Sequence, residues 1–327
     1  MSFTAPCRNF IMLSITICTL SAQPAHSDAS IADHASQFSK LATARSETLG
    51  IMGGDNGATG GTYKFYDDGT TMSVTKLGGR GTIGNARRIG GTSLSWVPML
   101  GGTVGYIDGK NRFLDNPVLV NNTEHFSTTA AGAEAGAKFY LTREISITPM
   151  LGLIYSYSES RFSPGTALGA KLKQQYSGQL FDWDLQSLCM VPSADIQYEK
   201  PLAEDWKLTL SSRYAWFNTW HLASSSTYLR GSGNSYDWKN KADIDVRLPL
   251  KFFGFPLHTG GFVSLDILGR DFRDTVGSNA MYTFNGRVVL GDLRGRWNLN
   301  WIGLGLSYIK SDTFYGYSIG LDTRLQF

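Results

Sequence analysis

Residues 236–252 alternate between apolar and charged side chains over 17 positions. The even-numbered positions, from Tyr236 to Phe252, are mostly aromatic or aliphatic, and the odd-numbered positions, from Asp237 to Lys251, are nearly all charged. Successive side chains of a β-strand point to opposite faces, so this pattern predicts a strand with one apolar face and one charged face. The run exceeds the roughly 5–6 residues of a typical soluble strand. It suits a strand that crosses a membrane, which needs about 9–11 residues within the bilayer.

The same alternation recurs in residues 131–141, 206–221 and 257–270. Strands of transmembrane barrels turn apolar side chains outward to lipid and polar side chains inward. The pattern therefore predicts an all-β protein, a transmembrane antiparallel up-and-down barrel with an even strand count of twelve. The expected strands lie near residues 61–67, 70–79, 91–108, 124–142, 146–162, 184–202, 206–223, 235–253, 256–273, 279–291, 295–310 and 315–327.

Connections between the predicted strands are of two kinds. Tight turns are expected at 143–144 and 254–255, whereas longer loops are expected at 163–178 and 224–235. Short periplasmic turns and longer outer loops are typical of barrels in the bacterial outer membrane.

The first 60 residues follow a different pattern. Arg8, an apolar stretch at 10–22 and a small-residue site before Asp28 predict a secretory signal over residues 1–27. Apolar residues at helical spacing then predict a helix within 29–50. The interpretation is a signal peptide at 1–27, a helix and glycine-rich linker at 28–60, and a barrel at 61–327.

Composition excludes several other classes. After the signal, the chain has no apolar run of the ~18 residues that a transmembrane helix requires. A net charge of +3 is too small to suggest nucleic-acid binding. Removal of the signal leaves Cys189 as the single cysteine, and the Cys and His spacing offers no zinc pattern. We therefore expect no cofactor and no metal.

The C-terminal strand carries the most specific signal. Its apolar face alternates up to a terminal phenylalanine and resembles the signal read by the outer-membrane barrel assembly machinery. The last strand must add to an open sheet edge and close the barrel, which gives this signal a physical reason. The residues of the expected assembly signal are Tyr317, Ile319, Leu321, Leu325 and Phe327.

A helix of about 20 residues followed by twelve strands resembles the translocator domain of autotransporters. That resemblance covers roughly residues 29–327 and implies a helix in or near the lumen of a twelve-stranded pore. No passenger is expected before the helix, so the chain resembles a solitary autotransporter-like barrel, exported through the periplasm and integral to the outer membrane.

Charged residues on the polar strand faces are the first candidates for function. They could line a channel, where rings of charge tune ion selectivity. Alternatively they could form a structural ladder of paired charges against the helix, because unpaired buried charge is costly. The lumen-lining candidates are Glu134, Lys138, Asp195, Arg213, Asp243, Asp245, Arg247, Asp266, Arg287, Asp322 and Arg324.

An alternative catalytic site lies on the outward face near the rim. His125 and Ser127 share that face, and pairing of the two strands about the turn at 143–144 brings Glu159 close to Ser127. Ser, His and a carboxylate form a hydrolase constellation. The arrangement is similar to that of outer-membrane lipid hydrolases, although the surrounding residues depart from their longer signatures.

We expect a non-enzymatic barrel that is either structural or a narrow, helix-plugged pore. The alternatives are an outer-leaflet lipid hydrolase, a small-solute channel and a translocator. The expected partners are outer-membrane lipids and the assembly machinery, and the sequence leaves the oligomeric state open.

Overall fold

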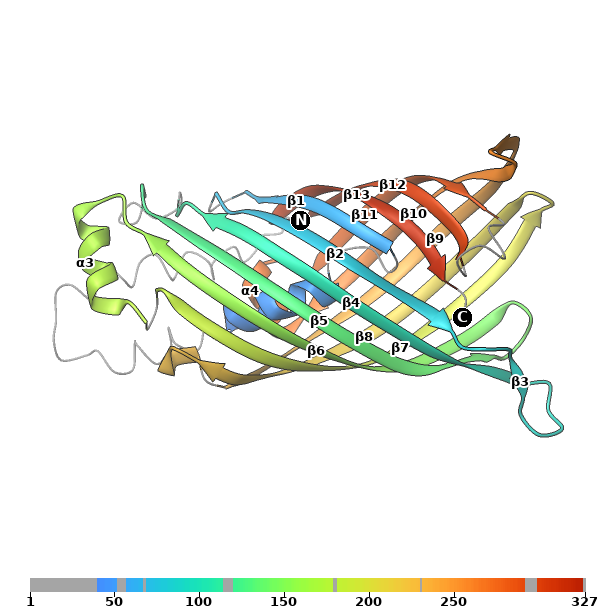
Figure 1. The fold of residues 1–327 in the computed structure, drawn as a ribbon, viewed down its shortest axis with the longest axis horizontal. Helices are drawn as coiled ribbons and strands as arrows, with labels where there is room; N and C mark the ends of the chain where they lie inside the picture. Colours follow the sequence, from blue (N-terminus) through green and yellow to red (C-terminus); the bar gives the residue numbers. More distant parts are fainter. Residues whose placement is uncertain are drawn as a thin grey trace, which may run out of the picture.

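The computed structural model describes residues 40–51, 57–66, 69–113, 120–178, 181–229, 231–291 and 299–325. In this part of the chain, twelve long antiparallel strands form a tilted barrel (Figure 1). The strands are β1 (Gly57–Phe65), β2 (Thr71–Thr82), β4 (Ser95–Asn111), β5 (Thr123–Tyr140), β6 (Ile145–Ser163), β7 (Trp183–Ala203), β8 (Trp206–Ser224), β9 (Ser232–Phe252), β10 (Phe255–Gly269), β11 (Ala280–Leu290), β12 (Leu299–Ser311) and β13 (Phe314–Leu325).

The sheet closes on itself. Consecutive long strands pair from β4 to β13, β13 pairs with β1, β1 pairs with β2, and β2 pairs with β4. Closure satisfies the backbone of every long strand on both sides, which a lipid environment requires. The predicted fold class and the strand count are therefore confirmed. The short β3 (Arg87–Arg88) pairs with the first residues of β4, in a hairpin that projects from one end (Figure 1).

The first three predicted strands have wrong boundaries, and the third, expected at 91–108, is β4 at Ser95–Asn111. β1 begins at Gly57, inside the predicted linker, because its glycines belong to the sheet. A β-carbon at Gly61 would lie 2.8 Å from Ser318 Cβ, so the glycine permits close approach to β13. β2 continues beyond the expected end at residue 79 to Thr82, because Arg80, Gly81 and Thr82 also pair with β4.

Another predicted boundary is wrong at the end of β10. The expected strand 256–273 stops at Gly269, and the helix α4 (Arg270–Val276) follows. Arg270 adopts a positive φ of 60°, which breaks the strand. The helix then carries Phe272 into the interior, where the ring is 1% exposed. Burial of this aromatic side chain favours the helix over a continued strand.

Helical elements gather at the end of the barrel opposite β3. Besides α4, they are α3 (Ala167–Tyr176) and a 3₁₀ turn, η1 (Thr227–Leu229). The opposite end has tight turns at 141–144, 204–205 and 253–254. We call these the loop end and the turn end. None of the described helices is both long enough and apolar enough to cross a membrane.

The two faces of the wall differ as the alternation predicted. Large apolar side chains such as Leu151, Leu153 and Val263 are about half exposed on the outer face. Inward positions such as Ile154, Val191 and Ser264 are buried. The predicted signal peptide lies outside the described residues.

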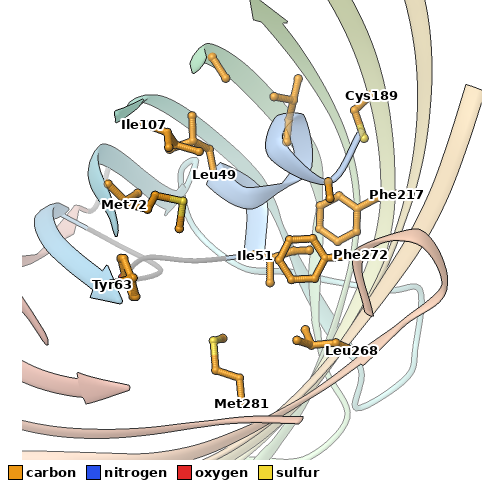
Figure 2. Close-up of a cluster of buried hydrophobic side chains, with 14 of the residues drawn as sticks. Leu49, Ile51, Tyr63, Met72, Ile107, Cys189, Phe217, Leu268, Phe272 and Met281 are labelled. Atoms are coloured by element: carbon orange, nitrogen blue, oxygen red, sulfur yellow. The ribbon is translucent and has the colours of Figure 1, made fainter. Parts of the chain in front are cut away.

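Residues 40–51 form a helix inside the barrel near the loop end, here called the plug helix (Figure 1). This helix is the C-terminal part of the one expected at 29–50. Figure 2 shows its last turn within a ring of inward-pointing side chains. Leu49 and Ile51 join a buried cluster with Ile107, Phe217 and Phe272 from the wall and α4.

Candidate functional site: a lumen closed by a helix

A buried ion pair joins the plug helix to the wall. Arg45 Nη1 lies 3.2 Å from Glu124 Oε1 of β5, and both side chains are about nine-tenths buried. The Ser160 hydroxyl donates to the same carboxylate oxygen at 2.6 Å. The Arg45 guanidinium also lies 3.9 Å from the centroid of the Phe126 ring. Both charges are thus paired and hydrogen-bonded, as burial demands.

A second contact joins the helix to β8. Thr43 Oγ1 lies 3.0 Å from His221 Nε2, and His221 Nδ1 lies 2.6 Å from the Leu229 carbonyl oxygen. Because a carbonyl only accepts, Nδ1 carries the proton in the neutral ring, and Nε2 accepts from the Thr43 hydroxyl. At the helix start, Lys40 Nζ lies 3.9 Å from Asp271 of α4.

Glu47 lies on the plug helix and not on a membrane-spanning strand. Its side chain is fully buried, and the Thr219 hydroxyl donates to its Oε1 at 2.7 Å. Burial raises the pKa of Glu47 from its ordinary value of 4.5 to about 8, against hydrogen bonds from Ser235 and Thr219 that lower it. The Asp271 carboxylate adds to the rise. The neutral carboxyl therefore fits this site better than the carboxylate.

Glycines in the wall make room for the helix. A β-carbon at Gly105 would lie 2.5 Å from Leu49 Cδ2, and one at Gly233 would lie 2.6 Å from Thr43 Cγ2. On the helix itself, a β-carbon at Gly50 would lie 2.7 Å from the Phe217 ring. At these positions the plug helix and the wall, which are far apart in the sequence, come into close contact. The sequence alone therefore did not identify the three glycines.

We call the part of the lumen around the plug helix the loop half, and the part between Ile51 and the turn end the turn half. Charged pairs between wall strands dominate the turn half. Arg80 of β2 holds Glu134 of β5 through two hydrogen bonds. Sequence reasoning missed Arg80, because the second strand was expected to end at residue 79.

Two further pairs lie on the wall formed by β9, β10 and β11. Arg287 donates to both carboxylate oxygens of Asp243, at 2.8 and 2.6 Å. Asp245 Oδ2 lies 3.0 Å from His258 Nδ1. The first pair joins β11 to β9 across β10, and the second joins the adjacent strands β9 and β10, so the order of strands in the sheet decides the charge partners.

The other predicted lumen residues are spread along the wall. Lys138 Nζ donates to Gln197 at 2.9 Å. Asp266 is fully buried and pairs with Lys239 at 3.2 Å. Asp195 lies opposite Arg213 in the β7–β8 register. Arg247 lies exposed near the turn end.

Two predicted lumen residues and the assembly signal lie on β13. Asp322 and Arg324 pair with Gly303 and Trp301 in the β12 register, and their side chains lie outside the described part. Tyr317, Ile319 and Leu321 share the outer face, with exposed fractions of 63%, 53% and 46%. The Leu325 side chain and the whole of Phe327 are outside the described part.

Two cavities lie in the turn half. The larger, called the chamber, has a volume of about 180 Å³ and is lined by β9–β13, β1 and Ile51 at the end of the plug helix. The smaller, about 70 Å³, lies against Gly50, Arg80, Glu134 and Arg213. Each exceeds the ~10–15 Å³ that one water molecule needs.

The predicted catalytic residues lie on the outer wall near the loop end. Ser127 Oγ donates to Glu159 Oε1 at 3.1 Å, and Glu159 also binds Arg161 at 3.1 Å. His125 lies across from Arg161 in the β5–β6 register. The structure brings Ser127 and Glu159 together directly, without His125 between them. Among the described residues, no cluster of three His, Cys, Asp or Glu side chains could hold a metal ion.

Fold and lumen together define a class: a closed, twelve-stranded barrel of the outer-membrane type with an N-terminal helix in its lumen. Residues 89–321 match the family model of the solitary outer membrane autotransporter β-barrel domain. The match spans most of the chain, which therefore belongs to this family. The expected resemblance and the integral outer-membrane location are confirmed.

Solved translocator domains share the fold. The chain matches the β domain of the Bordetella autotransporter BrkA with a TM-score of 0.52 and 10% identity, covering 81% of this chain and 96% of that one. It matches the transport unit of AIDA-I from Escherichia coli with a TM-score of 0.52 and 12% identity, covering 89% and 97%. No curated protein sequence matches significantly.

Proposed function

We propose that this protein is a non-enzymatic outer-membrane barrel that forms a narrow pore, closed by its plug helix. The observation that carries this proposal is that polar contacts hold the helix against the wall. We call the wall residues that make these contacts the seat of the helix. Arg45, Thr43 and Glu47 each bond a different wall residue. Water can replace such contacts when the helix leaves, whereas a wholly apolar seat would resist hydration.

The turn half supports the same proposal. Its two cavities, each large enough for water, and its paired charges suit a hydrated route that would reach Ile51, where the plug helix ends. Longer loops face outward in outer-membrane barrels, so the plug helix closes the outer half of the pore. The paired charges also keep the wall stable when the route fills with water.

Deletion of residues 28–50 tests the pore. We expect single-channel conductance in planar bilayers to rise when this segment is removed, because the loop half loses its obstruction. No conductance from either form would contradict the pore and leave a purely structural barrel.

A covalent lock tests the plug helix without deletion. The β-carbon position of Gly233 lies so close to Thr43 that Thr43→Cys with Gly233→Cys brings two thiols within disulfide reach. In a Cys189→Ala background, we expect the oxidised protein to stay closed and the reduced protein to conduct like its unlocked parent. The reduced sample is the matched control, because it carries the same substitutions.

The proposal assigns the outer wall to lipid contact and assembly. Half-exposed apolar residues such as Leu151 and Ile319 suit contact with outer-membrane lipids. The outward face of β13 suits recognition by the assembly machinery, as its pattern predicted. A non-enzymatic role is supported by Ser127, whose hydroxyl bonds a carboxylate directly instead of an imidazole.

A further inference from the structure

A groove crosses the outer face of the wall from β7 to β11. At its centre, Ala242 of β9 lies in the register between Leu210 of β8 and Val263 of β10. Tyr198 and Phe284 continue the same row on the outer strands. The single methyl group of Ala242 therefore leaves a hollow among larger apolar side chains. The groove has a volume of about 700 Å³, within the ~300–1,000 Å³ that is typical of small-molecule sites.

A chain of hydrogen bonds lies on the side of the groove nearer the loop end. Trp238 Nε1 donates to Ser212 Oγ at 2.9 Å, and Ser212 Oγ donates to Asn240 Oδ1 at 2.9 Å. Asn240 lines the groove, and its Nδ2 donates to no residue of the described part of the chain. A polar group that faces lipid is costly unless it is bonded, so this amide needs an acceptor from outside the protein.

The level of Asn240 suits the boundary between lipid headgroups and acyl chains. On its loop-end side, the outward residues Trp238 and Tyr214 are 44% and 42% exposed. Aromatic side chains of this kind form the girdle at a membrane interface. On its turn-end side, the outward residues Ala242 and Ile244 are apolar. Lipid ester groups lie at this boundary, so an ester carbonyl can reach the Asn240 amide.

We propose that the groove binds one acyl chain of an ester-linked lipid of the outer leaflet, and that its ester carbonyl accepts a hydrogen bond from Asn240 Nδ2. The acyl chain lies over Ala242. A second copy of the protein suits the groove less well, because a two-fold dimer would bring two hollows face to face. The leaflet rests on the proposed orientation, in which the loop end faces outward. The site goes beyond the proposed pore, because binding does not require the barrel to conduct.

The test compares two lipids that differ only in their linkage. One is phosphatidylethanolamine with ester-linked oleoyl chains, and the other is its analogue with ether-linked oleyl chains. The full, folded chain is freed of lipid in detergent and titrated with each lipid, and bound lipid is counted by native mass spectrometry. We expect a one-to-one complex with the ester lipid, at an affinity about threefold or more above that of the ether lipid, which has no carbonyl.

Two results of this titration would overturn the proposal. Equal affinities for the two lipids would mean that no carbonyl bonds Asn240. Failure of the ester lipid to form a stoichiometric complex would mean that the groove does not select a lipid from the surrounding bilayer. Both readings come from the parent protein, so they do not depend on the folding of any variant.

Substitutions locate the site on the wall. Asn240→Leu keeps a side chain of similar size without the amide, so the preference for the ester lipid should disappear. Ala242→Phe fills the hollow and should weaken binding about tenfold or more. Ala131→Phe makes the same change on the exposed outer face of β5 and should leave the affinity unchanged. Equal losses in the two phenylalanine variants, or a preference that survives Asn240→Leu, would contradict the site.

The mass spectra also report the oligomeric state. We expect a monomer that carries one lipid. A dimer that Ala242→Phe dissociates would assign the groove to a second copy and overturn the lipid site. Conductance is measured separately, so failure of lipid binding and failure of the pore remain distinguishable.

Discussion

The same strands enclose two unlike halves of the lumen. In the loop half, the plug helix occupies the axis, and polar wall residues such as Glu124 and Thr219 bond the helix. In the turn half, wall residues bond one another, as Arg287 bonds Asp243, and cavities remain. Because β9 supplies buried Ser235 to one half and Asp243 to the other, the difference does not come from different strands. It comes from whether a helix fills the axis.

The ion pair of Arg45 and Glu124 gives the largest expected effect. Arg45→Ala leaves the Glu124 carboxylate buried without its partner, and the seat of the plug helix should weaken by about 3–5 kcal/mol. Conductance of the full-length variant should then approach that of the deletion of residues 28–50. The double variant Arg45→Met with Glu124→Gln, which buries no lone charge, should lose much less. Equal losses in the single and double variants would show that the pair does not hold the helix.

Glu47 makes the same seat sensitive to pH. Its folded pKa of about 8 lies above its ordinary 4.5, so the seated helix binds more protons between these values. The stabilisation is complete below about pH 4.5, falls as the pH rises, and is lost above about pH 8, a change on the order of a few kcal/mol. Conductance measured from pH 5 to 9 should rise with pH. Glu47→Gln should flatten that profile, and an unchanged profile would remove Glu47 from the mechanism.

A substitution at Gly105 tests whether close packing, and not only charge, holds the plug helix in place. Gly105→Val places a side chain where Leu49 lies, and overpacking should weaken the seat by about 1–3 kcal/mol. Adding Leu49→Ala should restore part of the loss. Gly102→Val on the same strand, whose β-carbon would meet nothing closer than 3.6 Å, is the control and should leave the conductance unchanged. A control as disruptive as Gly105→Val would point to strand propensity instead.

Substitutions on the outer wall should have the smallest effect on stability and conductance. Ser127, Glu159 and Arg161 form an exposed network, so Ser127→Ala or Glu159→Gln should change stability by less than about 1 kcal/mol. Thermal unfolding and conductance should match those of the parent protein. We also expect no fatty-acid release from phospholipid by the parent. Release that Ser127→Ala abolishes would instead establish a lipid hydrolase.

The alternation of apolar and polar residues along the chain was by itself enough to predict the barrel. Side-chain direction along a strand is a local property of the backbone, so residues 236–252 showed which face meets lipid and which face meets the lumen. The count of twelve strands and the outward face of Tyr317 and Ile319 followed from the same local rule, and helical spacing of apolar residues predicted the helix before them. Glycine-rich composition misled that rule at Gly60, which was assigned to the linker, and at Arg80, which was placed beyond the end of a strand; both residues lie inside strands.

Only the tertiary structure decided which groups meet across the lumen. Arg45 and Glu124 are 79 residues apart, and Arg80 and Glu134 are 54 apart, so strand register and helix placement bring them together. The fit of Leu49 against Gly105 and the turn of the chain into α4 likewise depend on packing between distant segments. Alternation fixes the face on which a side chain lies. Its height in the barrel and its neighbours arise from closure of the whole sheet around the helix.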